Sequence, residues 1–293
     1  MITLKYDMNE RIKKTPDGNK YYLTGHGMWV RDFTAEQVPY VSLNETIQPK
    51  DYFNFLQNEI KNNIEKYTWI DSENFQMQDV VIVSDGYGFA EKQKILSKMP
   101  KSTNIIGVNG SLAKWNLTDR NMNWYLVNNP YDECMRYLPR RNRVFPKCVA
   151  SVKTNHKFLS AYKGSKYKYF PVNERKYTGS KKKEILWQID DYRNPICAAI
   201  SLSWALGVKK LILFCCDESF EDYRDGAVKM ENNLHQYPQQ IMCQNIIDKQ
   251  LYWLKQNDVE IFDHSSGIKY ENAEYISEED IQSFFSKECN KNE

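Results

Sequence analysis

The sequence lacks any apolar run near 18 residues and lacks a basic-then-apolar segment after Met1. We therefore expect neither a membrane span nor Sec-type export. It also lacks a Cys-x-x-Cys pair, because its seven cysteines are spread from Cys134 to Cys289 and several lie in apolar segments. Such use of cysteine is typical of a reducing compartment and argues against a structural zinc. We expect a cytoplasmic protein, or a virion component if the source is a virus.

Three catalytic and cofactor signatures are missing as well. The sequence contains no G-x-x-x-x-G-K-[ST] phosphate loop and no G-x-S-x-G nucleophile elbow. Gly86 and Gly88 lack the third glycine of a dinucleotide fingerprint, and Asn109 stands where an acid would end the following strand. These absences disfavour P-loop enzymes, α/β-hydrolases and NAD-dependent dehydrogenases.

The segment 194–220 predicts a helix that leads into a buried strand. Asn194 is a suitable N-cap, Pro195 fits the first helical position, and apolar residues then continue to a stop at Gly207. The apolar run 211–216 has the composition of a parallel strand that is covered on both faces. Asp217 follows the carboxyl end of this strand, which is where ligands bind in open α/β sheets.

A second unit of strand, glycine turn and helix lies upstream. A Val/Ile strand at 79–84 is followed by Asp-Gly-Tyr-Gly at 85–88 and a polar helical stretch at 90–98. Glycines at 86 and 88 allow a tight turn and a close approach to a phosphate, although an ordinary turn without a ligand explains them too. We predict a Rossmann-like α/β fold, a mostly parallel sheet with helices on both faces. Its strands are expected at 80–84, 105–108, 124–127, 211–215 and 259–262.

The first 75 residues predict an N-terminal extension to a domain at 76–293. Residues 20–33 have the pattern of a β-hairpin around Gly25-His26-Gly27, and apolar spacing of three to four predicts an amphipathic helix from Asp51 to about Tyr67. The extension either caps an edge of the sheet or, through residues 20–33, attaches a protein partner.

Residues 136–183 form a basic, aromatic insertion with fifteen Lys and Arg and a single acid, Glu174. This composition suits a nucleotide or a single-stranded nucleic acid, and a solvated insertion explains it equally well. The candidate polyanion-binding residues are Arg140, Arg141, Arg143 and Lys153. The piece 166–177 between two Gly-Ser pairs is expected to be a lid or a hairpin.

The order of these parts resembles the Rossmann-like family of the 6-hydroxymethylpterin pyrophosphokinase MptE and, more distantly, the family 42 sialyltransferases. The matching residues are Gly86 and Gly88, Asn109, the Ala-Leu-Gly at 205–207, and Asp217. The sequence departs from the family in two places: Phe89-Ala90 replaces Pro-Ser, and Cys215 replaces a glycine. Both departures are expected to crowd the phosphate side of the site.

The resemblance implies roles for further residues. It places a general-base histidine in the interval that holds His235, on position alone, and a phosphate-holding motif at the strand end His264-Ser265-Ser266. Asp217 is expected to position the sugar or ribose. The full set of expected nucleotide-binding residues is Gly86, Gly88, Asn109, Asn128, Asn129, His264, Ser265 and Ser266.

From these residues we expect a nucleotide-dependent transferase. The favoured class is a sialyltransferase-like glycosyltransferase that uses a nucleotide-sugar donor, and a CMP-sugar is one such donor. The acceptor is expected to be a carbohydrate or a polyanion. One alternative is a non-catalytic binding or assembly module, for example a viral structural component. A further alternative is an ATP-dependent pyrophosphokinase with magnesium at Asp217 and the acids that follow it, although the sequence does not require this metal.

Overall fold

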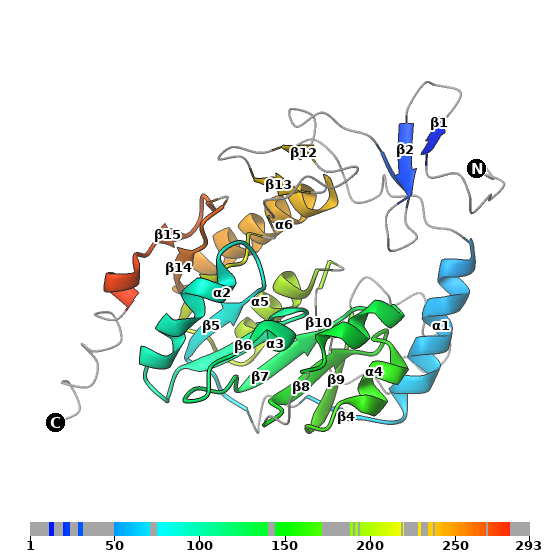
Figure 1. Ribbon diagram of the computed structural model, residues 1–293, viewed down its shortest axis with the longest axis horizontal. Coiled ribbons are helices and arrows are strands. Elements are labelled where there is room, and N and C mark those ends of the chain that lie inside the picture. Colours follow the sequence, from blue (N-terminus) through cyan, green and yellow to red (C-terminus); the bar gives the residue numbers. More distant parts are fainter. Residues whose placement is uncertain are drawn as a thin grey trace.

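The computed structural model describes residues 12–14, 20–23, 29–31, 50–70, 75–139, 144–171, 188–189, 191–192, 194–217, 219, 228–229, 234–236, 238–267 and 269–281. In these residues the main feature is one sheet in which every strand pair is parallel (Figure 1). Nine strands follow the order β10-β9-β8-β7-β6-β5-β11-β14-β15, and β4 pairs with β9. Their bounds are β4 Thr68–Trp69, β5 Asp79–Val83, β6 Asn104–Val108, β7 Trp124–Val127, β8 Lys147–Ser151, β9 Lys166–Pro171, β10 Gln188–Ile189, β11 Lys210–Phe214, β14 Glu260–His264 and β15 Glu274–Tyr275.

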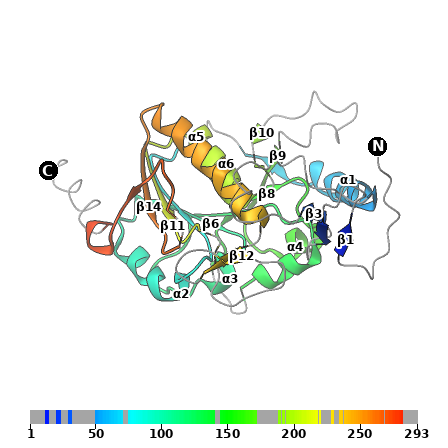
Figure 2. The ribbon, with the colours of Figure 1, turned by 90° about the horizontal axis from the view of Figure 1, so that it is seen from above.

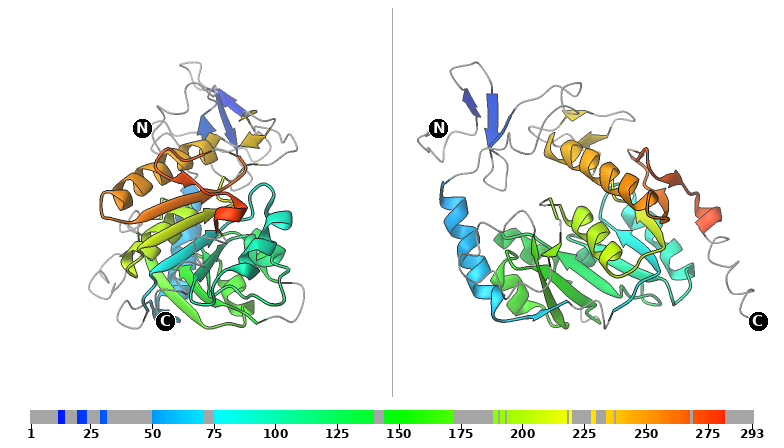
Figure 3. Two further views of the ribbon diagram at one scale, coloured as in Figure 1. Left: turned by 90° about the vertical axis from the view of Figure 1, so that its left-hand side faces the viewer. Right: turned by 180° about the vertical axis from the view of Figure 1, so that it is seen from behind.

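Helices cover both faces of this sheet (Figures 2 and 3). One face carries α5 (Pro195–Ala205) and α6 (Pro238–Lys255). The other face carries short helices: α2 (Phe89–Lys92), η3 (Gln93–Lys98), α3 (Ser111–Lys114), η4 (Asp132–Tyr137) and α4 (His156–Ala161). The prediction of a parallel, Rossmann-like α/β fold is confirmed, with the five expected strands at β5, β6, β7, β11 and β14.

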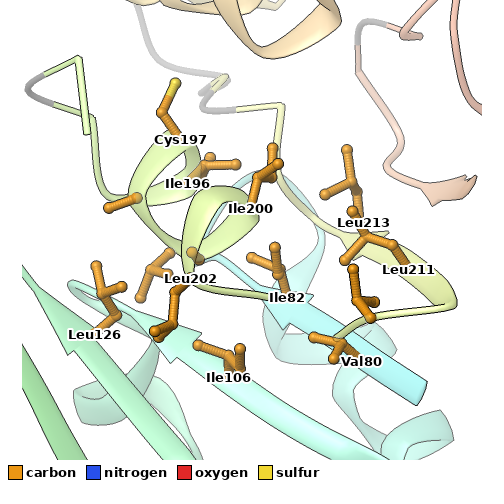
Figure 4. Packing of buried hydrophobic residues seen from close by; sticks show 14 of the residues in the cluster. Val80, Ile82, Ile106, Leu126, Ile196, Cys197, Ile200, Leu202, Leu211 and Leu213 are labelled. Carbon is orange, nitrogen blue, oxygen red and sulfur yellow. The ribbon is translucent and has the colours of Figure 1, made fainter. Parts of the chain in front are cut away.

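The core divides into two layers because neighbouring residues of a strand point to opposite faces. Val80 and Ile82 of β5 pack under α5 with Ile106 and Leu126, as Figure 4 shows. Val81 and Val83 of the same strand pack on the opposite side against the short helices. The sheet is therefore apolar on both faces, as the uninterrupted Val/Ile/Leu runs predict.

The helix before β11 begins and ends as its sequence predicts. The side chain of Asn194 accepts hydrogen bonds from the backbone of Ile196 and Cys197, and Pro195 occupies the first turn. Gly207 follows the helix with φ of 88°, a conformation that favours glycine. This cap and stop set α5 over the centre of the sheet.

The helix α1 (Lys50–Ile64) lies beside the carboxyl ends of β8 and β9. Leu56 and Ile60 pack against Val152 and Phe170, and the amide of Asn63 donates to the carbonyl of Val152 at 3.0 Å. The amphipathic helix predicted from Asp51 is thus confirmed. The division of the chain at residue 75 stays a prediction.

Two small antiparallel sheets accompany the main one. β1 (Ile12–Lys14), β2 (Lys20–Leu23) and β3 (Trp29–Arg31) form the first, in which β2 and β3 pair as expected for a hairpin within 20–33. β12 (Val228–Lys229) pairs with β13 (His235–Gln236). The part of the chain that the structure describes contains no helix long and apolar enough to cross a membrane.

The expectation of a lid or hairpin at 166–177 is wrong for residues 166–171, which form the parallel strand β9 between β8 and β10. The lysines at 166 and 168 interrupt the apolar pattern that predicts a buried strand. Lys168 is buried, and its Nζ lies 4.5 Å from the Trp69 ring centroid and donates to the carbonyl of Ile64. Residues 172–177 lie outside the described residues.

Candidate functional site

The strand order places a topological switch point between β5 and β11. The chain adds β6, β7, β8 and β9 on one side of β5 and then returns to add β11 and β14 on the other. In open α/β sheets, ligands bind outside the carboxyl ends of the strands at such a point, because the loops there diverge. The loops in question are 84–88, 109–110, 128–129, 215–217 and 264–267.

Asp217 is clamped between the two glycine turns at this point. Gly86 donates its N–H to the carbonyl of Cys215 at 3.2 Å, and a Cβ at Gly86 would lie 2.3 Å from Asp217 Oδ1. On the other side Gly267 donates its N–H to Asp217 Oδ2 at 2.7 Å. A Cβ at Gly267 would lie 2.2 Å from the same oxygen. Only glycine fits at either position, since any side chain would collide with the carboxylate.

The carboxyl group of Asp217 is fully buried. Burial raises its pKa, while hydrogen bonding by Ser219 and by the backbone of Gly267 and Tyr87 opposes that rise. The group therefore joins three loops, whereas the sequence reading expected it to face a ligand. This geometry favours a structural role for Asp217.

His235 lies on β13, next to the residue that secures Asp217. The side-chain amide of Gln236 donates to the backbone carbonyl of Asp217 at 2.5 Å, and Gln244 donates to the same oxygen at 3.1 Å. Successive residues of a strand point to opposite sides, so Gln236 faces Asp217 and His235 faces away. The structure thus brings the residue after His235 to Asp217, while the alternation of a strand turns His235 to the other side.

Asp263 is a buried acid that the sequence analysis did not single out. Burial raises its pKa to about 6, with a contribution from the charge of Asp217, although the hydrogen bonds of Ser265 lower it in part. The N–H of Ser265 donates to Asp263 Oδ1 at 3.0 Å, and Oδ2 has no hydrogen-bond partner in the described part of the chain. An acid directly after the apolar pair Ile261-Phe262, at the end of the expected strand 259–262, was the signal that could have identified it.

Two residues of the strand-end motif at 264–266, His264 and Ser265, make hydrogen bonds within the fold. His264 is buried, its Nδ1 lies 2.8 Å from the carbonyl oxygen of Ile276, and burial lowers its pKa. Ser265 accepts from the N–H of Cys216 at 3.0 Å. Ser266 is different, since its hydroxyl lies 3.8 Å from where a Cβ of Gly88 would be. Ser266 therefore borders the glycine turn, where a phosphate is expected.

The asparagines that end β6 and β7 leave two polar atoms open. Asn109 Oδ1 and Asn128 Nδ2 are buried and have no hydrogen-bond partner among the described residues. Asn129, in contrast, is saturated: its Nδ2 donates to Glu133 and Tyr137, and its Oδ1 accepts from the N–H of Tyr131. One acceptor and one donor on neighbouring strands thus remain to be satisfied.

The two departures from the family pattern have separate effects. Phe89 is buried in the core, with its ring centroid 6.4 Å from that of Trp115, so it does not crowd the strand ends as expected. Cys215 has φ of 52°, a left-handed conformation that favours glycine. The chain therefore keeps the backbone that the family's glycine would take, at a cost in strain.

The predicted polyanion site is divided between described and other residues. Lys153 is buried, with its Nζ 3.1 Å from Asp191 Oδ2, so an anion would compete with this ion pair. Arg140, Arg141 and Arg143 lie outside the described residues. Within the described residues no three or more His, Cys, Asp or Glu side chains are grouped so that they could hold a metal ion.

This strand order and switch point define a Rossmann-like α/β protein. No family model and no curated protein matches the sequence. Among solved structures, the chain is similar to the MAf glycosyltransferase from Magnetospirillum magneticum AMB-1, with a TM-score of 0.58, 14% sequence identity and coverage of 82% of this chain. The match spans 41% of the length of that protein. At this identity the comparison shows a shared fold.

Proposed function

We propose that this chain is a glycosyltransferase-like protein that binds a nucleotide-sugar along the carboxyl ends of β5, β6 and β7. One observation carries the proposal: Asn109 Oδ1 and Asn128 Nδ2 are buried without partners among the described residues, at the carboxyl ends of β6 and β7, the two strands next to β5 on one side. Unsatisfied buried polar groups are costly, so a ligand that pairs with both gains their full hydrogen-bonding energy. The fold shared with a solved glycosyltransferase and the resemblance to the MptE-like and sialyltransferase families support this class.

The proposed ligand fits the chemistry of each loop. An amide acceptor and an amide donor suit the hydroxyls of a ribose or the edge of a base. Ser266 and Lys92 border Gly88, and a hydroxyl and an ammonium group suit a phosphate. The proposal does not require a metal, because a hydroxyl and an ammonium group can themselves pair with a phosphate. A CMP-sugar is one donor to be tested, and the acceptor is a carbohydrate or a polyanion.

A second candidate, a non-catalytic binding or assembly module, is favoured by the burial of Asp217. Oδ2 of Asp217 accepts from Gly267 and its backbone carbonyl accepts from Gln236 and Gln244, so these contacts lie within the fold, while Oδ1 has no partner among the described residues. A partner at residues 20–33 and a polyanion at the three arginines of 140–143 belong to this candidate as predictions. The pyrophosphokinase alternative places magnesium at acids that lie mostly outside the described residues.

A thermal-shift panel of CMP, UDP, GDP and ATP, with and without magnesium, tests the proposal. A ligand at 100 times its Kd stabilises a protein by about 2.7 kcal/mol, which raises the Tm of a domain of this size by roughly 5–10 °C. Asn128→Ala should abolish this shift and leave the Tm of the free protein nearly unchanged, since Nδ2 bonds no described group. The exposed Asn245→Ala is the control. If no nucleotide moves the wild-type Tm, the non-catalytic candidate replaces this one.

A further inference from the structure

An ion pair bridges the loops at the carboxyl ends of β5 and β6. Asp85 lies two residues after the end of β5, and its Oδ2 is 3.1 Å from the Nζ of Lys114, the last residue of α3. The same ammonium group donates to the backbone carbonyl of Asp85 at 3.2 Å. The Asp85 side chain is 33% exposed, so its carboxylate reaches the surface at the switch point.

The carboxylate of Asp85 lies against Gly110, in the turn after β6. A Cβ at Gly110 would be 2.4 Å from Asp85 Oδ2 and 3.1 Å from Oδ1. Gly110 has φ of −67°, a conformation that any residue adopts, so its backbone does not require glycine. The missing side chain is what permits the close approach. The turn after β6 therefore has room for this carboxylate and for no side chain of its own.

The strand order places Asp85 between the two parts of the proposed nucleotide site. Asn128 follows β7 and Asn109 follows β6. Asp85 comes next, between the ends of β6 and β5, and Gly88 lies beyond it, beside Ser266 of the loop after β14. The distance from β7 to β5 is roughly 10 Å at the usual strand spacing. A nucleotide with its base at the asparagines and its phosphate at Gly88 covers this span, and its ribose then lies at Asp85.

The chemistry of Asp85 suits a ribose. A carboxylate only accepts hydrogen bonds and can accept from two donors at once, and the 2′- and 3′-hydroxyls of a ribose are two neighbouring donors. Hydrogen bonds to a charged acceptor are stronger than those between neutral groups. A negative charge beside a phosphate would repel it, but the ammonium group of Lys114 offsets the charge of Asp85.

A purely structural ion pair explains these observations less well. The Lys114 side chain is 55% exposed, and ion pairs with exposed partners contribute little to stability. An acid in the turn that is proposed to bind a phosphate also opposes the binding of that anion. Its presence there is a disadvantage unless the acid itself binds part of the ligand.

We propose that Asp85 binds the 2′- and 3′-hydroxyls of the donor's ribose and makes the site selective for ribonucleotides over deoxyribonucleotides. The inference rests on the proposed function. Lys114 holds the carboxylate in place and balances its charge. With the ribose bound to Asp85, the open polar atoms of Asn109 and Asn128 pair with the edge of the base.

Isothermal titration calorimetry with CMP, UDP, GDP and ATP, each compared with its 2′-deoxy and 3′-deoxy forms, tests the assignment. The wild type should bind a ribonucleotide at least about tenfold more tightly than either deoxy form, because each deoxy form loses one hydrogen bond to a charged acceptor. If either deoxy form binds as tightly as the ribonucleotide, the assignment is overturned while the proposed function stands. If no nucleotide binds the wild type, both proposals are overturned.

Asp85→Ala separates ribose binding from a structural role. It should weaken ribonucleotide binding by at least about tenfold and bring the ratio of the deoxy Kd to the ribo Kd close to one. Lys114→Ala is the matched control, because it breaks the same ion pair and keeps the acceptor. In Lys114→Ala the affinity should fall for all forms alike, and the ratio should stay near its wild-type value.

Gly110→Ala is a second variant, which also serves if Asp85→Ala does not fold. It keeps the carboxylate but displaces it from the end of β6, so it should lower the same ratio. A structural ion pair predicts a wild-type ratio in every variant. An unchanged ratio in Asp85→Ala and Gly110→Ala therefore overturns the proposal.

Discussion

Asp263→Asn should stabilise the protein at neutral pH, although it alters a fully buried polar residue. The backbone N–H of Ser265 donates to Oδ1 at 3.0 Å, and Oδ2 has no partner in the described part of the chain. The side-chain carbonyl of an asparagine can accept the same hydrogen bond from the N–H of Ser265. Its NH₂ group then takes the place of Oδ2, which accepts no hydrogen bond from a described donor. The change therefore removes a buried charge without breaking an existing contact.

The magnitude follows from the pKa of Asp263, which burial raises from 3.8 to about 6. A carboxyl whose pKa is higher in the folded state binds its proton more tightly there, so its ionisation opposes folding. This cost is absent below pH 4, grows between about pH 4 and 6, and is complete above pH 6. A shift of about two units corresponds to an upper limit of about 3 kcal/mol. Because the new amide is itself incompletely paired, we expect a net gain of about 1–2 kcal/mol.

Urea denaturation at pH 7.5 and pH 4 measures the effect. The free energy of unfolding of Asp263→Asn should exceed that of the wild type at pH 7.5, and the difference should vanish near pH 4. Protonation of His264, whose pKa is lowered by burial, destabilises both proteins in acid and cancels in the difference. The control is Asp258→Asn, which removes one exposed charge at φ of 60°, where asparagine is tolerated.

Two outcomes would refute this reasoning. One is a loss of stability in Asp263→Asn at pH 7.5, which would mean that the ionised carboxylate holds a contact essential to the fold. The other is a gain of equal size at both pH values, which would mean that packing and not charge is the cause.

Further expectations concern the turns, the buried ion pair and the helix cap. Gly86→Ala should lower the free energy of unfolding by at least about 2–3 kcal/mol, because the new methyl group would lie 2.4 Å from a backbone carbonyl oxygen. Gly207→Ala is the control: it has open space around it and only its left-handed backbone opposes the change, so it should cost about 1 kcal/mol. Equal losses in urea denaturation would contradict the steric argument. Lys153→Ala should lower the free energy of unfolding by about 3–5 kcal/mol in the same assay, because it leaves the Asp191 carboxylate buried without its lysine. A change below about 1 kcal/mol would show that the ion pair does not form in solution. Asn155→Ala should cost about 1–2 kcal/mol through loss of the α4 cap, and unchanged hydrogen exchange in that helix would count against it.

The central strands could be predicted from the sequence because each is a short apolar run bounded by turn residues. β5, β6, β7 and β11 fall within one residue of their expected bounds. β9 could not be predicted in this way, since lysines and tyrosines alternate along it and a lysine is buried through its aliphatic stem and its bond to α1. A buried lysine looks like a surface residue until its partner is known.

The candidate site was predictable in outline and not in its polar contacts. Parallel strands bring their carboxyl ends to one edge, so Gly86, Asn109 and Asp217 could be expected to converge there. The burial of Asp217 depends on a second turn at Gly267, fifty residues further on. The ion pair of Asp85 with Lys114 spans 29 residues and has no local signature. Such contacts depend on how elements pack, which short-range patterns do not record.

The position of β11 has a consequence for folding during synthesis on the ribosome. β5 ends at Val83 and its neighbour β11 begins at Lys210, so the strand that completes the centre of the sheet is translated long after the strand it must join. Until then β5 has an open edge and the turn at Gly86 has no carbonyl to bond. The nascent chain must keep this edge from pairing with other chains until β11 has emerged and joined β5.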